Sequence, residues 1–301
     1  MAVRNIKLTI AYDGSNYHGW QFQPERRTIQ GELVKAISEL IGWKVRVCGA
    51  SRTDAGVSAI GQVALIQIDS PIPTENLAKA INDRLPRDIA VREAVEIPLG
   101  FDIIGAVKSK LYRYTIYTGK VTPVLQIKHC WHVPAKLDTA AMDEAAKMLV
   151  GEKDFKSFAS AADQRESSVR TILRCDVISS RVMRDASQGI CHEDTKSQRN
   201  SKIKKTKASS YLGDLVAKNT QYAIPVAELR NTQYENDWIY IDVQGDSFLY
   251  NMVRNIVGTL VEIGIGMWKP EKINEILEAK DRTAAGPIAP AAGLCLMWIK
   301  Y

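Results

Sequence analysis

The loop Gly49-Ala50-Ser51-Arg52-Thr53-Asp54-Ala55-Gly56-Val57-Ser58-Ala59 joins two stretches, 44–48 and 62–68, that are typical of β-strands. Small residues surround one base and one acid, so the backbone can approach a ligand closely there. An aspartate before Ala-Gly is ordinarily a turn residue that bonds its own backbone. The sequence therefore predicts a strand–loop–strand unit that presents a single carboxylate, Asp54, either to the turn or to a ligand.

Strands and helices alternate on both sides of this unit. The pattern predicts further strands at 6–11, 89–97, 110–117, 172–182, 238–244 and 294–299, and helices from Thr28 and at 74–85, 138–150, 250–263 and 270–279. This mixture favours an α+β fold, with mostly antiparallel sheet and helices on one face. The two halves repeat a similar plan, so we expect two similar lobes: 1–105, which carries the loop of Asp54, and 106–301.

A polar segment at about 185–235 departs from this periodicity. Within it, residues 196–207 contain six cations and no acid. Its composition favours a solvated, mobile insertion between two strands. The alternative is a basic arm that contacts nucleic-acid phosphates.

Composition limits the class of protein. The 301 residues include 40 Lys plus Arg against 34 Asp plus Glu, a net charge of +6, which fits a polyanionic partner without requiring one. The most apolar stretch, 255–268, is too short to cross a bilayer and contains Glu262. Five scattered cysteines and four histidines leave few metal ligands. We expect a cytoplasmic protein without membrane association and with little scope for metal chemistry.

The predicted helix at 250–263 is apolar around most of its circumference, and Arg254 lies on the remaining sector with Tyr250 and Asn251. An unpaired buried arginine costs several kcal/mol, so an acidic partner is expected, and Asp54 is the candidate. The alternative is that Arg254 extends to solvent. Sequence spacing leaves both open.

Aromatic and basic residues lie together at two places. In the strand at 110–117, Tyr112 shares a face with Tyr114, where tyrosines either pack in a core or stack on an extruded base. The turn after the first strand adds weaker RNA-binding candidates: Trp20, Gln21, Gln23, Arg26 and Arg27.

Several motifs, in order along the chain, resemble those of the tRNA pseudouridine synthase A (TruA) family. They are Tyr12-Asp13-Gly14, Gly19-Trp20-Gln21, Arg52-Thr53-Asp54-Ala55-Gly56-Val57, Lys110-Leu111-Tyr112-Arg113-Tyr114, the segment 248–258 and Ala292-Gly293-Leu294. The resemblance spans nearly the whole chain apart from 185–235. It implies an isomerase that converts uridine to pseudouridine at about positions 38–40 of the tRNA anticodon stem-loop, as a homodimer without cofactor or metal. It also implies the family's pseudouridine synthase fold, with a basic catalytic cleft between the two lobes.

The resemblance also implies a role for each matching residue. Asp54 corresponds to the catalytic aspartate, Arg52 to the residue that helps extrude the nucleotide, Tyr112 to the one that stacks on the base, and Arg254 to the partner of the carboxylate. An arginine partner would lower the pKa of Asp54, and a base in a stem must be flipped out before it can react. Whether Asp54 acts as nucleophile or base stays open.

Two positions, Ser51 and Ser58, depart from the glycine and histidine usual in the family, and we expect an effect on local RNA contacts alone. Two alternatives remain at this level. One is a pseudouridine synthase for another tRNA position or another structured RNA. The other is a non-catalytic RNA-binding protein on the same scaffold, which would need neither Asp54 nor Arg254.

Overall fold

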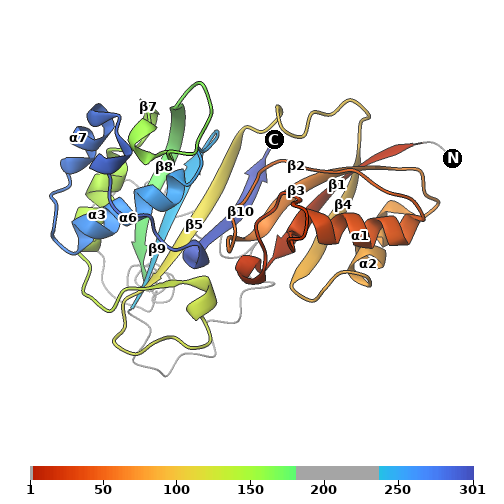
Figure 1. Ribbon diagram of the computed structural model, residues 1–301, viewed down its shortest axis with the longest axis horizontal. Helices are drawn as coiled ribbons and strands as arrows, with labels where there is room; N and C mark the ends of the chain where they lie inside the picture. Colours follow the sequence, from red (N-terminus) through yellow and green to blue (C-terminus); the bar gives the residue numbers. More distant parts are fainter. Residues whose placement is uncertain (1–2, 181–236) are drawn as a thin grey trace, which may run out of the picture.

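The computed structural model describes residues 3–180 and 237–301, which form one ten-stranded sheet (Figure 1). The sheet order is β4-β1-β3-β10-β5-β9-β8-β7, with β2 paired to β3 and β6 to β5. Its strands are β1 Arg4–Tyr12, β2 Val47–Gly49, β3 Ser58–Ile68, β4 Ile89–Ile97, β5 Ser109–Tyr117, β6 Trp131–His132, β7 Gly151–Asp154, β8 Val169–Ser179, β9 Trp238–Gly245 and β10 Leu294–Lys300. The described helices of eight or more residues are α1 Ile29–Ile41, α2 Thr74–Asn82, α3 Thr139–Lys147, α6 Met252–Gly264 and α7 Lys272–Ala279.

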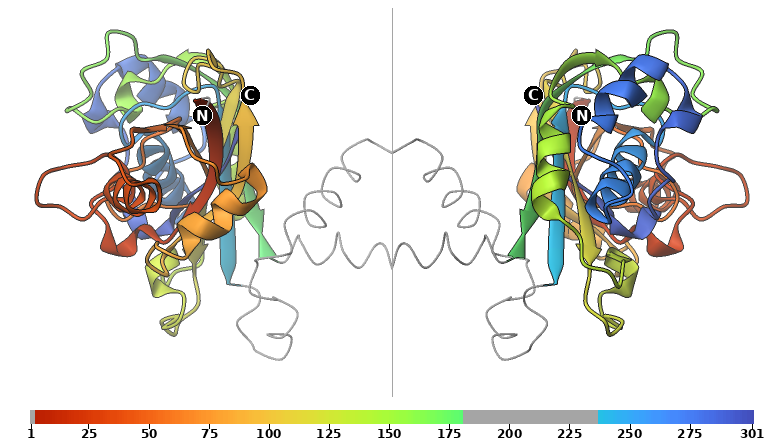
Figure 2. Two further views of the ribbon diagram at one scale, coloured as in Figure 1. Left: turned by 90° about the vertical axis from the view of Figure 1, so that its right-hand side faces the viewer. Right: turned by 90° about the vertical axis from the view of Figure 1, so that its left-hand side faces the viewer.

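One face of the sheet forms the core. In β1, Ile6, Leu8 and Ile10 are fully buried, whereas Lys7 and Thr9 between them are partly exposed, as expected when alternate side chains point to opposite faces. Helices α1 and α6, from opposite ends of the chain, lie on the same side of the sheet (Figure 2). The predicted α+β class is confirmed.

The last strand joins the two halves of the chain. β10 pairs in parallel with β3, with Cys295 opposite Ser58, and antiparallel with β5, with Leu294 opposite Tyr114. The sheet is therefore continuous from the first half to the second. The boundary between two lobes near residue 105 stays a prediction.

Most predicted elements are present, with shifted ends. The helix predicted from Tyr250 begins at Met252, because Asn251 has a left-handed backbone conformation with φ 61°. The strand predicted at 44–48 occupies Val47–Gly49, and β3 begins at Ser58 instead of Gln62. The predicted insertion at 185–235 lies outside the described residues.

Candidate active site

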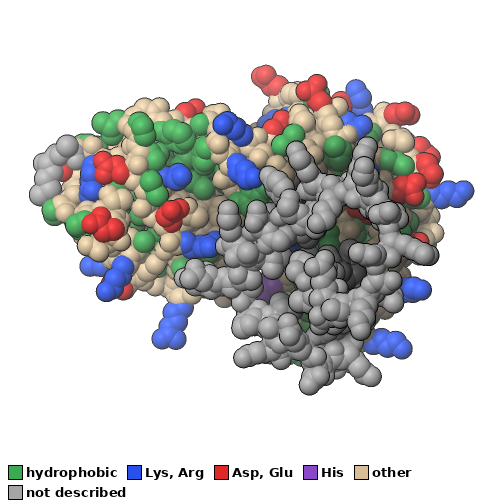
Figure 3. Space-filling view, turned by 180° about the vertical axis from the view of Figure 1, so that it is seen from behind, with side chains coloured by type: hydrophobic (Ala, Val, Ile, Leu, Met, Phe, Trp, Pro, Cys, Tyr) green, Lys and Arg blue, Asp and Glu red, His purple; other side chains and the backbone are tan. Residues whose placement is uncertain are grey.

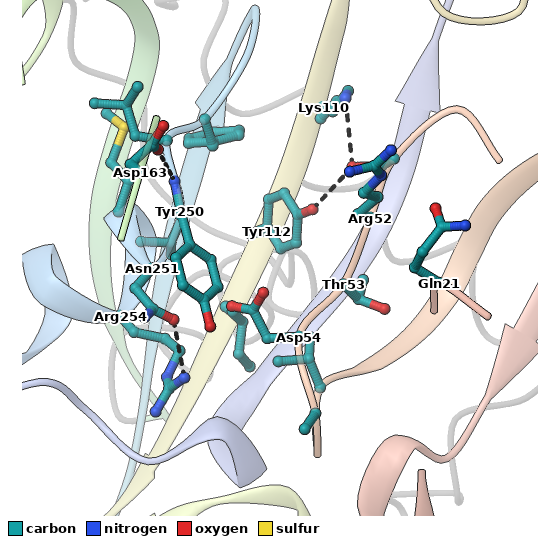
Figure 4. Close-up of a pocket in the computed structure, with 18 of the residues that line it drawn as sticks. Gln21, Arg52, Thr53, Asp54, Lys110, Tyr112, Asp163, Tyr250, Asn251 and Arg254 are labelled. Carbon is teal, nitrogen blue, oxygen red and sulfur yellow. Dashed lines mark hydrogen bonds between the residues drawn. The ribbon is translucent and has the colours of Figure 1, made fainter. Parts of the chain in front are cut away.

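A cavity of about 870 Å³ opens between segments from both halves of the chain. The loop of Asp54 forms one wall, Lys110 and Tyr112 of β5 lie at its base, and Tyr250 and Arg254 face it from the second half (Figure 4). Asp54 is half-buried, and its carboxylate points into this space.

The backbone of the loop rests on the segment that follows β1. A Cβ added to Gly14 would overlap the carbonyl of Val57, so this approach requires glycine. The amide of Gly14 donates to Ser58 Oγ at 3.0 Å, and the amide of Trp20 donates to the Thr53 carbonyl at 3.0 Å. Ser58, expected to affect RNA contacts alone, therefore helps to hold the loop in the structure.

The turn after Asp54 uses the main chain and leaves the side chain available. The amide of Val57 donates to the Asp54 carbonyl at 3.1 Å, and Gly56 has φ +79°, which glycine adopts without strain. Among the described residues, none donates a hydrogen bond to the Asp54 carboxylate, whose surroundings act on it through burial and charge. The structure therefore disagrees with the interpretation of Asp54 as a turn residue bonded to its own backbone.

Buried polar side chains fix the loop to the sheet. The Tyr12 hydroxyl lies 2.8 Å from Thr53 Oγ1, and the fully buried Gln62 donates from Nε2 to the Ser51 carbonyl at 2.8 Å. Ser51 Oγ lies 3.1 Å from the Tyr112 hydroxyl. Ser51 therefore links the loop to a residue of the cavity, which goes beyond the expected role in local RNA contacts.

Tyr112 is held in one orientation at the base of the cavity. Its side chain is 6% exposed, and its ring packs edge-on against Phe248 with 5.2 Å between centroids. Burial raises the pKa of the hydroxyl to about 12, with Ser51 opposing the shift. The phenol is therefore neutral at physiological pH, and it can donate a hydrogen bond.

Arg254 is anchored by neutral groups. Its Nε donates to the Ala289 carbonyl at 2.7 Å, and its Nη1 donates to Asn251 Oδ1 at 3.1 Å. Among the described residues no ion pair within 4.0 Å joins Arg254 to Asp54, although both face the same cavity (Figure 4). The strained backbone of Asn251 thus serves to place an acceptor beside the guanidinium.

The pKa of Asp54 is raised above its ordinary value. Burial raises this pKa most, while the positive charges of Arg254 and Arg165 lower it by a smaller amount. The direction is opposite to the lowering that we expected from an arginine partner. The arginine charges therefore offset only part of the cost of burial.

Three residues that the sequence analysis missed complete the walls. Arg165 donates from Nη1 to the Phe248 carbonyl at 2.6 Å and pairs with Asp163 at 3.1 Å, while Asp163 accepts from the Tyr250 amide at 2.6 Å. These bonds tie their loop to the segment before α6. Both residues lie in a stretch without periodicity, so no sequence pattern indicated them.

Lys110 is the third missed residue. Its Nζ donates to the Ala50 carbonyl at 3.2 Å and to Ser51 Oγ at 3.3 Å, and burial lowers its pKa. The sequence motif around Tyr112 includes Lys110, which was the available signal.

The weaker RNA-binding candidates separate into two groups. Gln21 and Gln23 line the cavity together with Arg52, whose side chain is exposed. Trp20 is 1% exposed, so its ring belongs to the core.

Arg26 and Arg27 do not line this cavity. Arg27 is occupied by ion pairs with Glu32 at 3.0 Å and Asp88 at 3.4 Å, and its guanidinium lies over the Tyr17 ring. The structure therefore brings Asp54, Arg52, Tyr112 and Arg254 together but leaves this arginine outside.

Within residues 3–180 and 237–301, no helix is long and apolar enough to span a membrane. In the same part of the chain, no group of three or more His, Cys, Asp or Glu side chains is placed to hold a metal ion. The absence of a cofactor stays a prediction.

Comparison with known proteins identifies the class. A family described as "tRNA pseudouridine synthase" matches residues 8–104 and 145–301. Proteins named tRNA pseudouridine synthase A from Moorella thermoacetica and Acetivibrio thermocellus are 40% and 37% identical, over 98% and 99% of this chain and 99% and 100% of theirs. A protein of the same name from Caldicellulosiruptor saccharolyticus is 36% identical over 99% of this chain and 100% of its own.

The chain belongs to the tRNA pseudouridine synthase family, and its full-length similarity is to the A (TruA) type. The protein is accordingly an isomerase, as the motifs predicted.

Proposed function

We propose that this protein converts uridine to pseudouridine in the tRNA anticodon stem-loop, at about positions 38–40, with Asp54 as the catalytic group. The observation that carries the proposal is the carboxylate of Asp54, which points into a cavity built from both halves of the chain and accepts no hydrogen bond from the described residues. A carboxylate that served to stabilise the loop would accept hydrogen bonds from the residues of that loop.

The reaction needs no oxidant or reductant. The bond between C1′ of the ribose and N1 of uracil breaks, the base turns, and C1′ bonds to C5; the proton lost from C5 is balanced by the proton gained at N1. One carboxylate can assist as nucleophile or as proton acceptor. Burial leaves the Asp54 carboxylate poorly solvated, which favours either role, and the arginine charges keep its pKa from rising further.

The neighbouring side chains have separate tasks in this proposal. Arg52, exposed at the mouth of the cavity, helps to extrude the nucleotide, because a paired base must leave its stack before it can react. Tyr112 presents a fixed aromatic ring for stacking on the uracil. Arg254 faces the same cavity as Asp54 and supplies positive charge there. Hydrogen bonds to Asn251 and Ala289 hold its guanidinium in place.

The choice of tRNA is supported by the names of the relatives. The anticodon position, the homodimer, the cytoplasmic location and the division into two lobes are further predictions that follow from the motif resemblance.

The test is pseudouridine mapping on an unmodified tRNA transcript that carries uridines at about positions 38–40. We expect pseudouridine at those positions after incubation with the purified protein, detected by carbodiimide labelling and primer extension. A matched transcript with cytidines there should remain unlabelled. Pseudouridine at other positions would favour a synthase of different specificity, and binding without any product would favour a non-catalytic RNA-binding protein.

A further inference from the structure

A second cavity, of about 540 Å³, adjoins the cavity of Asp54. Four residues line both: Gln21, Gly49, Arg52 and Ile104. The two cavities therefore adjoin along one surface, and a single RNA strand can reach both. An open space of this size can take one nucleotide.

The second cavity carries positive charge that the protein does not neutralise. Lys44, Arg46 and Arg52 line it, and no acidic residue does. All three side chains are exposed, and none takes part in the ion pairs or side-chain hydrogen bonds found among the described residues. Other arginines of the protein are neutralised by acids: Arg113, for example, forms an ion pair with the buried Asp242 at 2.7 Å.

Figure 3 shows the molecule from behind, where the described side chains include both basic and acidic ones. The lining of the second cavity differs from this mixture, because it contains three cations and no acid. Such a group suits the phosphates of a nucleic acid.

An aromatic side chain stands at the same cavity. Phe22 is 59% exposed, which is unusual for a phenylalanine, while its backbone is fixed. Gln30 of α1 holds that backbone: its Oε1 accepts from the Phe22 amide at 2.7 Å and from Gln21 Nε2 at 2.9 Å, and its Nε2 donates to the Val47 carbonyl at 2.8 Å. The backbone that carries the ring is therefore already ordered before a ligand binds, which lowers the entropy cost of binding.

We propose that the second cavity binds an unpaired nucleotide of the RNA strand that also delivers the target uridine to Asp54. Its base stacks on Phe22, and the phosphates beside it contact Lys44 and Arg46. Arg52, which lines both cavities, lies between the two bound nucleotides. This inference rests on the proposed function, because it takes the ligand to be the same RNA.

The first test compares affinities for the unmodified tRNA transcript across a range of salt concentrations. Replacing both Lys44 and Arg46 with glutamine removes about two phosphate contacts, so the plot of log affinity against log salt should flatten by roughly 1.5 units. Phe22→Ala should weaken binding by roughly fivefold to a hundredfold with the salt slope unchanged. Lys79→Gln is the matched control, because Lys79 is an exposed cation of α2 that lines neither cavity.

Binding at wild-type strength and wild-type salt slope in the Phe22 and Lys44/Arg46 variants would overturn the inference, as would equal losses in the Lys79 control. Phe22, Lys44 and Arg46 are exposed, so we expect these variants to fold, and a denaturant melt of each variant checks this. A second experiment uses an anticodon stem-loop RNA with 4-thiouridine in its loop. Photocrosslinks to residues 22 or 44–46 are expected, and crosslinks confined to other segments would contradict the proposal.

The inference and the proposed function can fail separately. If the variants bind the RNA as predicted but the wild-type protein forms no pseudouridine, the proposed function fails while the RNA site stands. If it forms pseudouridine at the expected positions and the variants bind normally, the second cavity has no such role.

Discussion

The hydroxyl of Ser51 lies 3.1 Å from the hydroxyl of Tyr112, and this contact joins the loop that carries Asp54 to strand β5. It is one of the few direct side-chain links between the loop of the first half and the strand that begins the second. The relative position of the carboxylate and the tyrosine ring therefore depends on it.

Replacement of Ser51 by alanine should lower the rate of pseudouridine formation by roughly threefold to tenfold, because one hydrogen bond contributes about 0.5–1.5 kcal/mol. Tyr112→Phe should produce a similar loss through the same bond if stacking is retained. The double variant should lose little more than either single one. Fully additive losses in kcat/KM would show that the two hydroxyls act independently.

Replacement of Gly14 by alanine should destabilise the protein by about 1–3 kcal/mol, because the new Cβ overlaps the carbonyl of Val57 and the loop must move. Activity should fall as well, since Asp54 lies in that loop. Gly100→Ala is the control, because no atom lies within 4 Å of a Cβ at that position. Equal unfolding free energies for both variants in a denaturant titration would contradict this account of the loop.

Asp54→Asn should make the free protein more stable at neutral pH. Burial raises the pKa of Asp54 above its ordinary 3.8, so the folded state binds the proton more tightly than the unfolded chain does. The free energy of unfolding consequently falls as pH rises through the ordinary pKa towards the raised one, and the loss is complete above the raised pKa. Asparagine does not titrate, so its advantage should be present at pH 7 and vanish below the ordinary pKa. A less stable Asn variant at pH 7 would oppose this.

Arg254→Met should reduce both stability and activity. It leaves the carbonyl of Ala289 and the amide of Asn251 without their donor, at a cost of about 1–3 kcal/mol. It also removes a charge that lowers the pKa of Asp54, so the acid limb of the pH–activity profile should move to higher pH. Arg254→Lys should restore part of that pH shift. A fully active methionine variant would show that Arg254 has no role in the site.

Local patterns were sufficient to predict the fold class and most elements. Alternation in β1 and the apolar circumference of α6 are properties of neighbouring residues, and both are confirmed. β10 pairs in parallel with β3, with Cys295 opposite Ser58 and Leu296 opposite Ala59. Neither segment contains a local pattern that predicts which strand the other pairs with.

Within the site, the motifs indicated Asp54, Arg52, Tyr112 and Arg254, and the structure places all four around one cavity. Arg254 lowers the pKa of Asp54 as predicted, but burial raises this pKa by more, and burial depends on tertiary packing that local sequence patterns do not contain. Arg165 was missed for a similar reason: it lies in a loop, and only the fold brings it to the cavity.

In the proposed reaction, the isomerisation depends on the carboxylate of Asp54. The most direct measurement is single-turnover pseudouridine formation on the tRNA transcript by Asp54→Asn, with the affinity of the variant for the same RNA measured in parallel. We predict that the variant binds the transcript with nearly wild-type affinity and forms no detectable pseudouridine. Product formation by the Asn variant at a rate near that of the wild type would contradict the claim.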